Sequence, residues 1–333
     1  MFTPSARPDG ETRHSTPNAR PIPRVDNPSR AYVERLLRSD REPTILRGLT
    51  DDWAMMKQWT PSAFSKRFGE KTISALVDLP LTGVTLPGGQ ASYEKQMRFD
   101  KYIEHMMSNP ALPCYLAYTR LEDAFPELKE DCQFDELAGP GRMTPDTRLW
   151  IGSGGTRSML HADLKDNFFV QTFGTKKVLM ASPHDTPGVY PFRDNIVNSE
   201  VNPDQPDFER FPRFRDVDLL EATLAPGDML FIPRGWWHYL RSLEPSISVN
   251  YFFGKPLVFA DYARQLLQLG VPYWVAAVRD LVRYGLLKRE YKVDFFFSPP
   301  PTGKRLFDFL RTGDFSKEND PATDGEKHPG EGS

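Results

Sequence analysis

Hydrophobic and polar positions change their spacing along the chain. From Pro113 to Phe253 the apolar residues form short runs, rich in β-branched and aromatic side chains and separated by glycine and proline turns such as Pro226–Asp228. Many short strands with turns of this kind are typical of an antiparallel sandwich or jelly roll. The expected strands are CYLAY, RLWIG, NFFVQTFG, KKVLMAS, EATLAPGDMLFIP, WWHYL and ISVNYFF.

Helical spacing flanks this β-rich stretch. We expect a helix that starts at Asn27–Pro28, with Asn27 as its cap, then a strand at PTILRGL and a second helix around Pro61 to Phe68. After Lys255, apolar residues recur at spacings of three and four, which predicts further helices. The expected buried face of the first helix is Tyr32, Val33, Leu36 and Leu37.

The two ends of the chain are polar and low in apolar residues, so we expect both to be disordered. No internal repeat or long linker separates them. The predicted organisation is a disordered arm over 1–22, a β-rich domain with an N-terminal helical and strand elaboration over 23–257, helices over 258–311 and a disordered tail over 312–333.

Composition and charge narrow the function classes. The chain is 39% hydrophobic and 26% charged, and its formal net charge of -3 argues against nucleic acid as a partner. The two cysteines, Cys114 and Cys132, match no disulfide framework or zinc-site spacing and favour reduced thiols in a cytoplasmic protein. We find no signal-peptide pattern and no apolar run of about 18 residues, so no membrane span is expected.

Candidate metal chemistry lies in the stretch SMLHADLKDNFFVQTFGTKK. In a strand, His161 and Asp163 would point to the same face. A third ligand candidate is His238, in the run FIPRGWWHYL, because a sandwich can bring distant strands together. Two histidines and one carboxylate are the ligand set of non-haem Fe(II) oxygenases. Taken alone, His161 and Asp163 are also consistent with a structural pair.

Oxygenases of this kind commonly use 2-oxoglutarate, whose far carboxylate needs a cation. Lys176 is the candidate, because a lysine on an apolar strand is costly to bury unless an anion meets it. The alternative is that Lys176, like its neighbour Lys177, lies on the surface. Ser158 and Tyr115 are candidate donors to the same carboxylate, and Tyr115 is equally consistent with core packing.

Two asparagines are candidates for hydrogen bonds near the metal-bound end of that cosubstrate, namely Asn167 and Asn250. In ISVNYFF, alternation places Ile247, Val249 and Tyr251 on one face and Asn250 on the other. A buried asparagine must find hydrogen-bond partners. Both residues are also consistent with turn or ladder positions.

These runs resemble a known family, the JmjC-type, cupin-fold Fe(II)/2-oxoglutarate oxygenases. The resemblance extends from about Pro43 to Phe253 and is carried by PTILRGLTDDWAMMKQW, HADLKDNFFVQTFGTKKVLMASP, LAPGDMLFIPRGWWHYLRSL and ISVNYFF. It implies a mainly β fold with flanking helices, a double-stranded β-helix (jelly roll) followed by a C-terminal helical segment. Ser158 stands where relatives often carry threonine, which keeps the hydroxyl. The implied iron ligands are His161, Asp163 and His238, and the implied cosubstrate residues are Lys176, Ser158, Tyr115, Asn167 and Asn250.

The resemblance implies hydroxylation of a protein or peptide side chain, coupled to conversion of 2-oxoglutarate and O2 to succinate and CO2, with ascorbate as a supporting reductant. The alternatives are hydroxylation of a small molecule or a modified tRNA base, lysine demethylation, and a cupin-like binding module without turnover. Substrate selection is expected in the loops Tyr118 to Met143 and Tyr190 to Phe214.

The C-terminal helices carry more apolar surface than a cap on one sandwich needs, and in several relatives such helices form a homodimer. We therefore expect a homodimer here. The alternative is a membrane-surface role, supported by Arg279, Arg283, Lys288 and Arg289. The apolar residues concerned are Leu266, Leu267, Leu269, Val271, Tyr273, Trp274, Val275, Val278, Leu281 and Val282.

Overall fold

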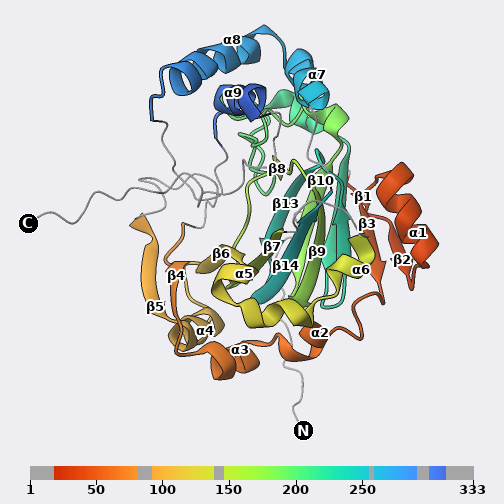
Figure 1. Cartoon of the computed structure of the whole chain (residues 1–333), viewed down its shortest axis with the longest axis vertical. Coiled ribbons are helices and arrows are strands. Elements are labelled where there is room, and N and C mark those ends of the chain that lie inside the picture. The colour runs from red at the N-terminus through yellow and green to blue at the C-terminus, as the bar shows by residue number, and fades with distance from the viewer. Residues whose placement is uncertain (1–18, 81–91, 139–145, 255–258, 291–299, 313–333) are drawn as a thin grey trace, which may run out of the picture.

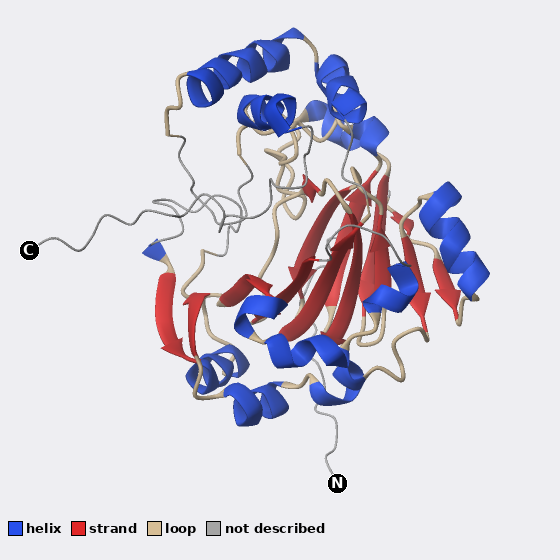
Figure 2. Ribbon diagram, in the orientation of Figure 1, coloured by secondary structure: helices blue, strands red, loops and turns tan. Residues whose placement is uncertain are grey.

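The computed structural model describes residues 19–80, 92–138, 146–254, 259–290 and 300–312. The strands of these residues form two facing sheets (Figures 1 and 2). The smaller sheet has the order β1 (Arg20–Pro21), β11 (Leu219–Leu224), β10 (Lys176–Ala181), β13 (Trp237–Ser242) and β8 (His161–Ala162). The larger sheet has the order β2 (Arg24–Asp26), β3 (Thr44–Arg47), β12 (Met229–Ile232), β9 (Asp166–Phe173), β14 (Ser246–Phe253), β7 (Asp146–Gly152), β6 (Tyr115–Arg120), β4 (Thr72–Leu76) and β5 (Glu94–Arg98).

Strand alternation explains how the two sheets enclose a core. On β9, Phe168 packs with Phe231 and Val249 on the outer face of the larger sheet, where the N-terminal helices cover it. The next residue, Phe169, points the other way and packs against Val178 of the smaller sheet. A strand that is apolar on both faces is expected where both faces are covered. The predicted sandwich of short strands is therefore confirmed.

The N-terminal segment joins both sheets, which the expected disordered arm over 1–22 did not anticipate. β1 pairs in parallel with β11, β2 pairs in parallel with β3, and Ile22 between them is buried. Both strands lie at sheet edges. At an edge, a proline does not remove a hydrogen bond between neighbouring strands. Residues 1–18 and 313–333 lie outside the described residues.

The first helix begins two residues later than expected. α1 (Arg30–Arg35) is capped by Ser29, whose hydroxyl accepts a hydrogen bond from the Tyr32 amide. Asn27 is not the cap. Its backbone amide donates a hydrogen bond to the carbonyl oxygen of Arg47 in β3, and its backbone is left-handed, with φ 47°. The predicted face is confirmed for Val33, Leu36 and Leu37, which are buried, while Tyr32 is half-buried.

Helices cover the sandwich on two sides (Figure 1). Those from the N-terminal part pack on the larger sheet through Trp53, Phe64 and Phe99. Those from the C-terminal part form a separate cluster with Leu164 and Ile196 near β8. None of the described helices is long and apolar enough to span a membrane. Besides α1, the helices are η1 (Leu36–Asp40), α2 (Ala54–Gln58), α3 (Pro61–Phe68), α4 (Phe99–Met107), α5 (Leu121–Ala124), η3 (Pro126–Asp131), α6 (Phe134–Ala138), η4 (Pro183–Asp185), η5 (Pro212–Asp216), α7 (Phe259–Leu269), α8 (Val271–Asp280), η6 (Leu281–Leu286) and α9 (Thr302–Thr312).

Candidate metal and cosubstrate site

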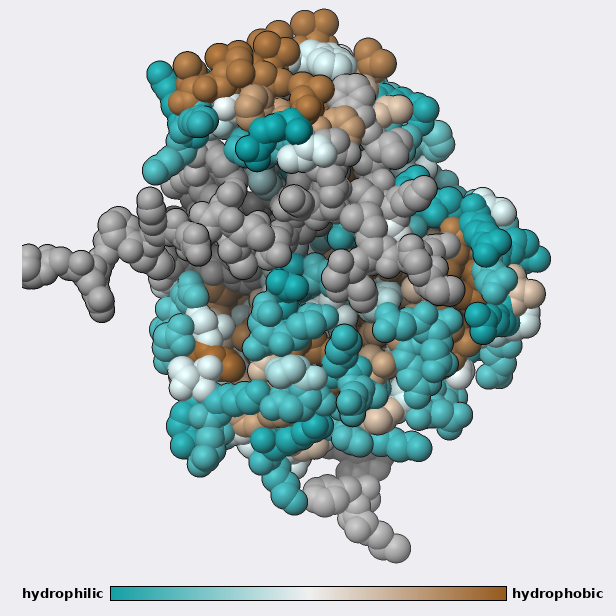
Figure 3. Space-filling view, viewed as in Figure 1, coloured by the Kyte–Doolittle hydropathy of each residue, from teal (hydrophilic) through white to brown (hydrophobic). Residues whose placement is uncertain are grey.

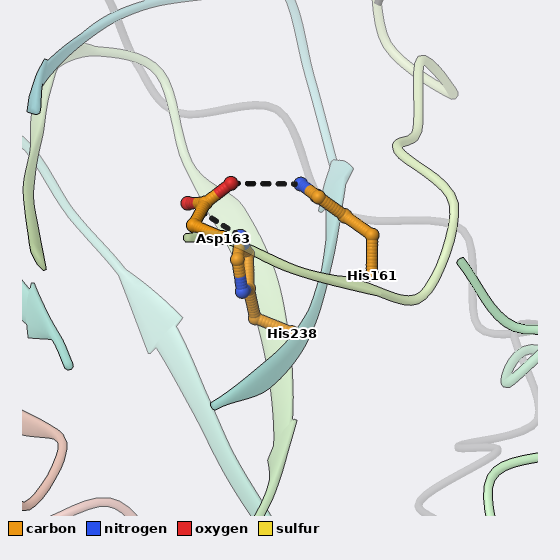
Figure 4. Close-up of side chains that lie close together, drawn as sticks. All are labelled: His161, Asp163 and His238. Carbon is orange, nitrogen blue, oxygen red and sulfur yellow. Dashed lines mark ion pairs between the residues drawn. The ribbon is translucent and has the colours of Figure 1, made fainter. Parts of the chain in front are cut away.

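Two histidines and an aspartate converge between the sheets. His161 on β8 lies opposite His238 on β13, and Asp163 follows directly after β8 (Figure 4). The Nε2 atom of His161 is 3.8 Å from one carboxylate oxygen of Asp163, and that of His238 is 3.4 Å from the other. One ligand atom from each residue lies within 4.8 Å of the others. The structure thus brings together the three predicted ligands, although β8 spans only two residues.

Backbone hydrogen bonds fix the orientation of both imidazoles. The Nδ1 atom of His161 is 2.8 Å from the carbonyl oxygen of Met159, and that of His238 is 3.0 Å from that of Trp236. A carbonyl oxygen can only accept, so each Nδ1 carries a proton, and in the neutral ring the lone pair of Nε2 lies on the side of Asp163. Metal-ligating histidines commonly have this arrangement.

The pKa values of the three groups differ because their surroundings differ. Burial and the neighbouring His238 lower the pKa of His161 to about 4, so this ring is neutral near pH 7. Burial alone would lower the pKa of His238, but the charge of Asp163 and the hydrogen bond to it outweigh burial and raise that pKa. Burial alone would raise the pKa of Asp163, but the two histidines and Asn167 lower it. A carboxylate between imidazoles is suited to a divalent cation.

Asn167 lies behind the triad and does not belong to the cavity lining. Its side-chain amide donates to Asp163 at 3.1 Å, and it is fully buried. The structure therefore places it as a positioning residue for the carboxylate, whereas the sequence suggested a direct contact with the cosubstrate.

Replacing Asn167 with alanine is expected to weaken metal binding by about 10–100-fold, the usual cost of losing a partner behind a ligand. Titration of the protein with Mn(II) measures this. Gln171→Ala is the matched control, because Gln171 is a buried amide on the same strand that bonds only to the carbonyls of Phe173 and Gly174 in the described structure. An equal loss in both variants would mean that the effect is general destabilisation.

A cavity of about 130 Å³ adjoins the triad and contains Lys176. Lys176 is 3% exposed, and its ammonium donates to the Ser248 hydroxyl at 2.8 Å. Burial lowers its pKa to about 7, and no carboxylate of the described residues lies within ion-pair distance of it. Lys177 points to the opposite face and pairs with Glu221 at 3.0 Å. A buried ammonium without a counter-ion fits a site for an anionic ligand.

The remaining predicted cosubstrate residues lie around the same cavity. Ser158, Tyr115 and Asn250 all contribute to its lining. The Ser158 hydroxyl oxygen accepts from the Leu240 amide at 3.0 Å, which leaves its proton available to a ligand. Burial raises the pKa of Tyr115 well above its usual value, so its hydroxyl keeps its proton. Three potential donors and one ammonium thus share a cavity with the triad.

Trp150, Tyr118 and Arg305 are among the lining residues that the sequence did not single out as site residues. Alternation along RLWIG could have placed Trp150 opposite the core residues Leu149 and Ile151. Its indole N–H is buried and has no acceptor among the described residues. Tyr118 lies in an expected substrate loop, and Val197 and Asn198 of the other loop also line the cavity. No sequence signal indicated Arg305, which belongs to α9.

The residues fit both groups that the ligand set implies. Two imidazole nitrogens, on rings that backbone hydrogen bonds hold in place, and one ionised carboxylate suit Fe(II). A cavity with a buried ammonium, hydroxyl groups and a buried indole N–H that has no acceptor among the described residues suits a dicarboxylate such as 2-oxoglutarate.

Comparison with known proteins agrees with this geometry. Residues 30–257 match the family model described as "Cupin-like domain". The chain is 32% identical over 237 residues to "Lysine-specific demethylase 8" of Xenopus tropicalis, covering 70% of this chain and 52% of that protein. It is 28% identical over 249 residues to "Jumonji C domain-containing protein 5" of Drosophila melanogaster, covering 70% and 59% respectively. It is 37% identical over 142 residues to "HSPB1-associated protein 1" of Homo sapiens, covering 41% and 29%.

The chain spans about half the length of the first two of these relatives. The matched region contains the whole triad, Lys176 and the strands that position them. On this match, and with two facing sheets around a His–Asp–His centre, the chain belongs to the cupin-like family of JmjC-type proteins.

Proposed function

We propose that this protein is an Fe(II)- and 2-oxoglutarate-dependent oxygenase that hydroxylates a protein or peptide side chain. The observation that carries the proposal is the presence of the triad and a buried ammonium in one cavity. The family assignment supports the same chemistry. When bound, iron and 2-oxoglutarate supply the oxidation of a C–H bond by O2, with release of succinate and CO2.

The residues of the chain have separate tasks in this proposal. His161, Asp163 and His238 hold the metal, and the backbone carbonyls behind the histidines keep their rings in place. Lys176 pairs with the carboxylate of 2-oxoglutarate that lies far from the metal. Trp150 and the other aromatic lining residues exclude water from the site.

Succinate formation from 2-oxoglutarate, with added Fe(II) and ascorbate, tests the proposal. We expect the full chain to release succinate. Absence of succinate together with absence of Fe(II) and Mn(II) binding would favour a binding module without turnover.

Lysine demethylation is the second candidate, favoured by the name of two relatives in frogs and fish, "Lysine-specific demethylase 8". Hydroxylation of an N-methyl group leads to loss of formaldehyde, so both reactions need the same centre. Measuring formaldehyde beside succinate distinguishes them, because side-chain hydroxylation releases none.

Binding of 2-oxoglutarate is expected to weaken as the pH rises above 7. Burial lowers the pKa of Lys176 to about 7, and a bound carboxylate raises it again, so binding above that pH takes up a proton. The affinity should fall by up to about tenfold per pH unit between about pH 7 and 9. Calorimetric titration of the Mn(II)-loaded protein, in buffers of different ionisation enthalpy, measures both effects. An affinity that does not change over this range would contradict the role of Lys176.

We further propose that the C-terminal helices form a homodimer interface. Leu266, Leu269, Trp274 and other residues of these helices pack on their own domain. The opposite face of these helices is exposed to solvent, and Figure 3 shows hydrophobic residues gathered over α8. An exposed apolar stripe of this kind commonly marks an interaction surface. Its residues are Leu267, Val271, Val275, Val278, Val282 and Leu286, with exposures of 69, 73, 63, 58, 39 and 61%.

The double variant Val275→Asp, Val278→Asp is expected to be monomeric at micromolar concentrations where the wild-type protein sediments as a dimer. Two carboxylates in the centre of the stripe would have to be buried without partners. Leu243→Asp is the control, because Leu243 is an exposed leucine on the sandwich. A monomeric wild-type protein that binds anionic lipid vesicles would instead favour the membrane-surface role.

A further inference from the structure

The carboxylate of Asp166 joins three segments of the chain beside the candidate metal ligands. Asp166 begins β9, shortly after the ligand Asp163, and is 3% exposed. Both terminal nitrogens of the Arg41 guanidinium donate to it, one to each carboxylate oxygen. The backbone amide of Arg234 donates to the same carboxylate at 2.9 Å. This one side chain therefore connects the residue after η1, the start of β9 and the turn that precedes β13.

The turn from Pro233 to Gly235 connects this carboxylate to the segments of two metal ligands. The Gly235 amide donates to the carbonyl oxygen of Asp163 at 2.8 Å. The turn leads into Trp236, whose carbonyl oxygen orients the His238 ring. A shift of this turn would therefore move the backbone of one ligand and the group that fixes the ring of another. Groups that orient metal ligands in this way influence metal affinity.

The backbone of Arg41 has a conformation that favours glycine. Its φ is 48°, and its amide ends the preceding helix by donating to the Leu36 carbonyl at 3.0 Å. Helices that end in this way commonly have glycine in the left-handed position. Glycine would have no side chain to reach Asp166, whereas the Arg41 guanidinium reaches it and is also fixed by the Leu37 carbonyl at 3.0 Å. A strained residue of this kind points to a task for its side chain.

Arg41 and Asp166 influence the site through other residues. Neither is among the described residues that line the cavity. The Asp166 side chain is 4% exposed and that of Arg41 is 30% exposed, so water screens the pair less than a pair on the surface. Removal of one partner would leave the other charge without its counter-ion. The start of β9 and the turn would then lose their common anchor.

We propose that the Arg41–Asp166 ion pair positions the metal centre, because it holds the segments of Asp163 and His238 at the separation at which both can bind one cation. The inference rests on the candidate metal site that the proposed function uses. Arg41 and Asp166 are positioning residues in this account and not ligands. Without the pair, metal binding has to order the two segments first, and this ordering lowers the affinity.

Mn(II) titration of the full chain and the absorption spectrum of the Co(II)-loaded protein test this proposal. In Arg41→Gln we expect the Mn(II) affinity to fall by about tenfold or more, the lower end of the cost of losing a group behind metal ligands. The d–d bands of Co(II) should also shift, because they report the geometry of the ligands. Arg41→Lys keeps the charge and a donor, so it should recover part of the affinity. It also keeps the test valid if the glutamine variant unfolds.

Arg47→Gln is the matched control. The Arg47 guanidinium donates to Asp228 at 2.7 Å, and this carboxylate is also buried and also accepts from a backbone amide of a turn, that of Ala225 at 3.0 Å. Asp228 directly precedes β12, whereas the turn from Pro233 to Gly235 directly follows it. Arg47→Gln should therefore lose a similar ion pair at the far end of the strand and keep the wild-type Mn(II) affinity and Co(II) spectrum.

Two results would overturn the inference while leaving the metal site in place. One is wild-type Mn(II) affinity with a wild-type Co(II) spectrum in Arg41→Gln or, if that variant unfolds, in Arg41→Lys. The other is an equal loss of affinity in Arg47→Gln, because the effect would then be general destabilisation. A wild-type protein that binds no Mn(II) would instead overturn the metal site itself, and with it the proposed oxygenase function.

Discussion

Replacing His161 with alanine is expected to abolish succinate formation and to weaken Fe(II) and Mn(II) binding by more than about 100-fold. This loss is larger than the cost of losing a residue that only hydrogen-bonds to a metal ligand. The variant keeps one imidazole and one carboxylate. It lacks the His161 imidazole, which supplies one of the three ligand atoms that lie within 4.8 Å of one another. The loss should be specific, because the His161 side chain is 29% exposed and its removal leaves no closed void in the core.

His184→Ala is the matched control for this prediction. His184 lies in η4, is exposed, and is not part of the cavity lining. Thermal unfolding of both variants in the absence of metal should be close to that of the wild-type protein. Metal binding or succinate formation at the wild-type level in His161→Ala would contradict the assignment of the metal site.

Replacing Lys176 with methionine is expected to have opposite effects on binding and on stability. Loss of a buried partner for a carboxylate costs about 2–5 kcal/mol, so the affinity for 2-oxoglutarate should fall by about 30-fold or more. Methionine fills a similar volume between the rings of Tyr115 and Phe169, which lie 5.9 and 5.5 Å from the lysine ammonium. The comparison therefore tests charge more than shape.

Without 2-oxoglutarate, the same variant should be more stable than the wild-type protein. Burial lowers the pKa of Lys176 from 10.5 to about 7, so the charged form destabilises the fold. This penalty grows as the pH falls from 10.5 to about 7 and is constant below that. At about 1.4 kcal/mol for each pH unit, the gain in the free energy of unfolding should reach roughly 3–5 kcal/mol near pH 7 and shrink near pH 10.

Urea unfolding at the two pH values and titration with 2-oxoglutarate measure the two effects. Lys177→Met is the matched control on the same strand, because Lys177 pairs with Glu221 outside the cavity. It should change neither the affinity nor the pH dependence of stability to this extent. A methionine variant that binds 2-oxoglutarate as tightly as the wild-type protein would show that Lys176 does not hold the cosubstrate.

The β-rich part of the fold could be predicted because its signals are local. Runs such as NFFVQTFG and ISVNYFF combine strand propensity with turns at fixed places, and they became β9 and β14. The limits of the predictions were also local. Asn27 reads as a helix cap, but its backbone pairs with β3, so Ser29 caps α1. The sequence around residues 20–22 predicts disorder, but in the fold this segment extends the edge of a sheet by pairing with β11, which is distant in the sequence.

The site shows the same division. Residue types and their alternation selected the ligand candidates and separated Asn250 from the core residues beside it. They could not separate Lys176 from Lys177, since the two differ only in which face of β10 they occupy. They also could not show that Asn167 supports Asp163 from behind, because this depends on a distance of 3.1 Å between two side chains.

By itself, the sequence determined the class of fold and the chemical types available at its centre, because strand periodicity and ligand identity are written in short stretches. Only the tertiary structure decided which polar groups lose their water together. The convergence of β8 with β13, the burial of Lys176 without a counter-ion among the described residues, and the entry of Arg305 from α9 all join segments that are distant in the chain. Burial and electrostatic coupling depend on these distances in space, which no local pattern contains.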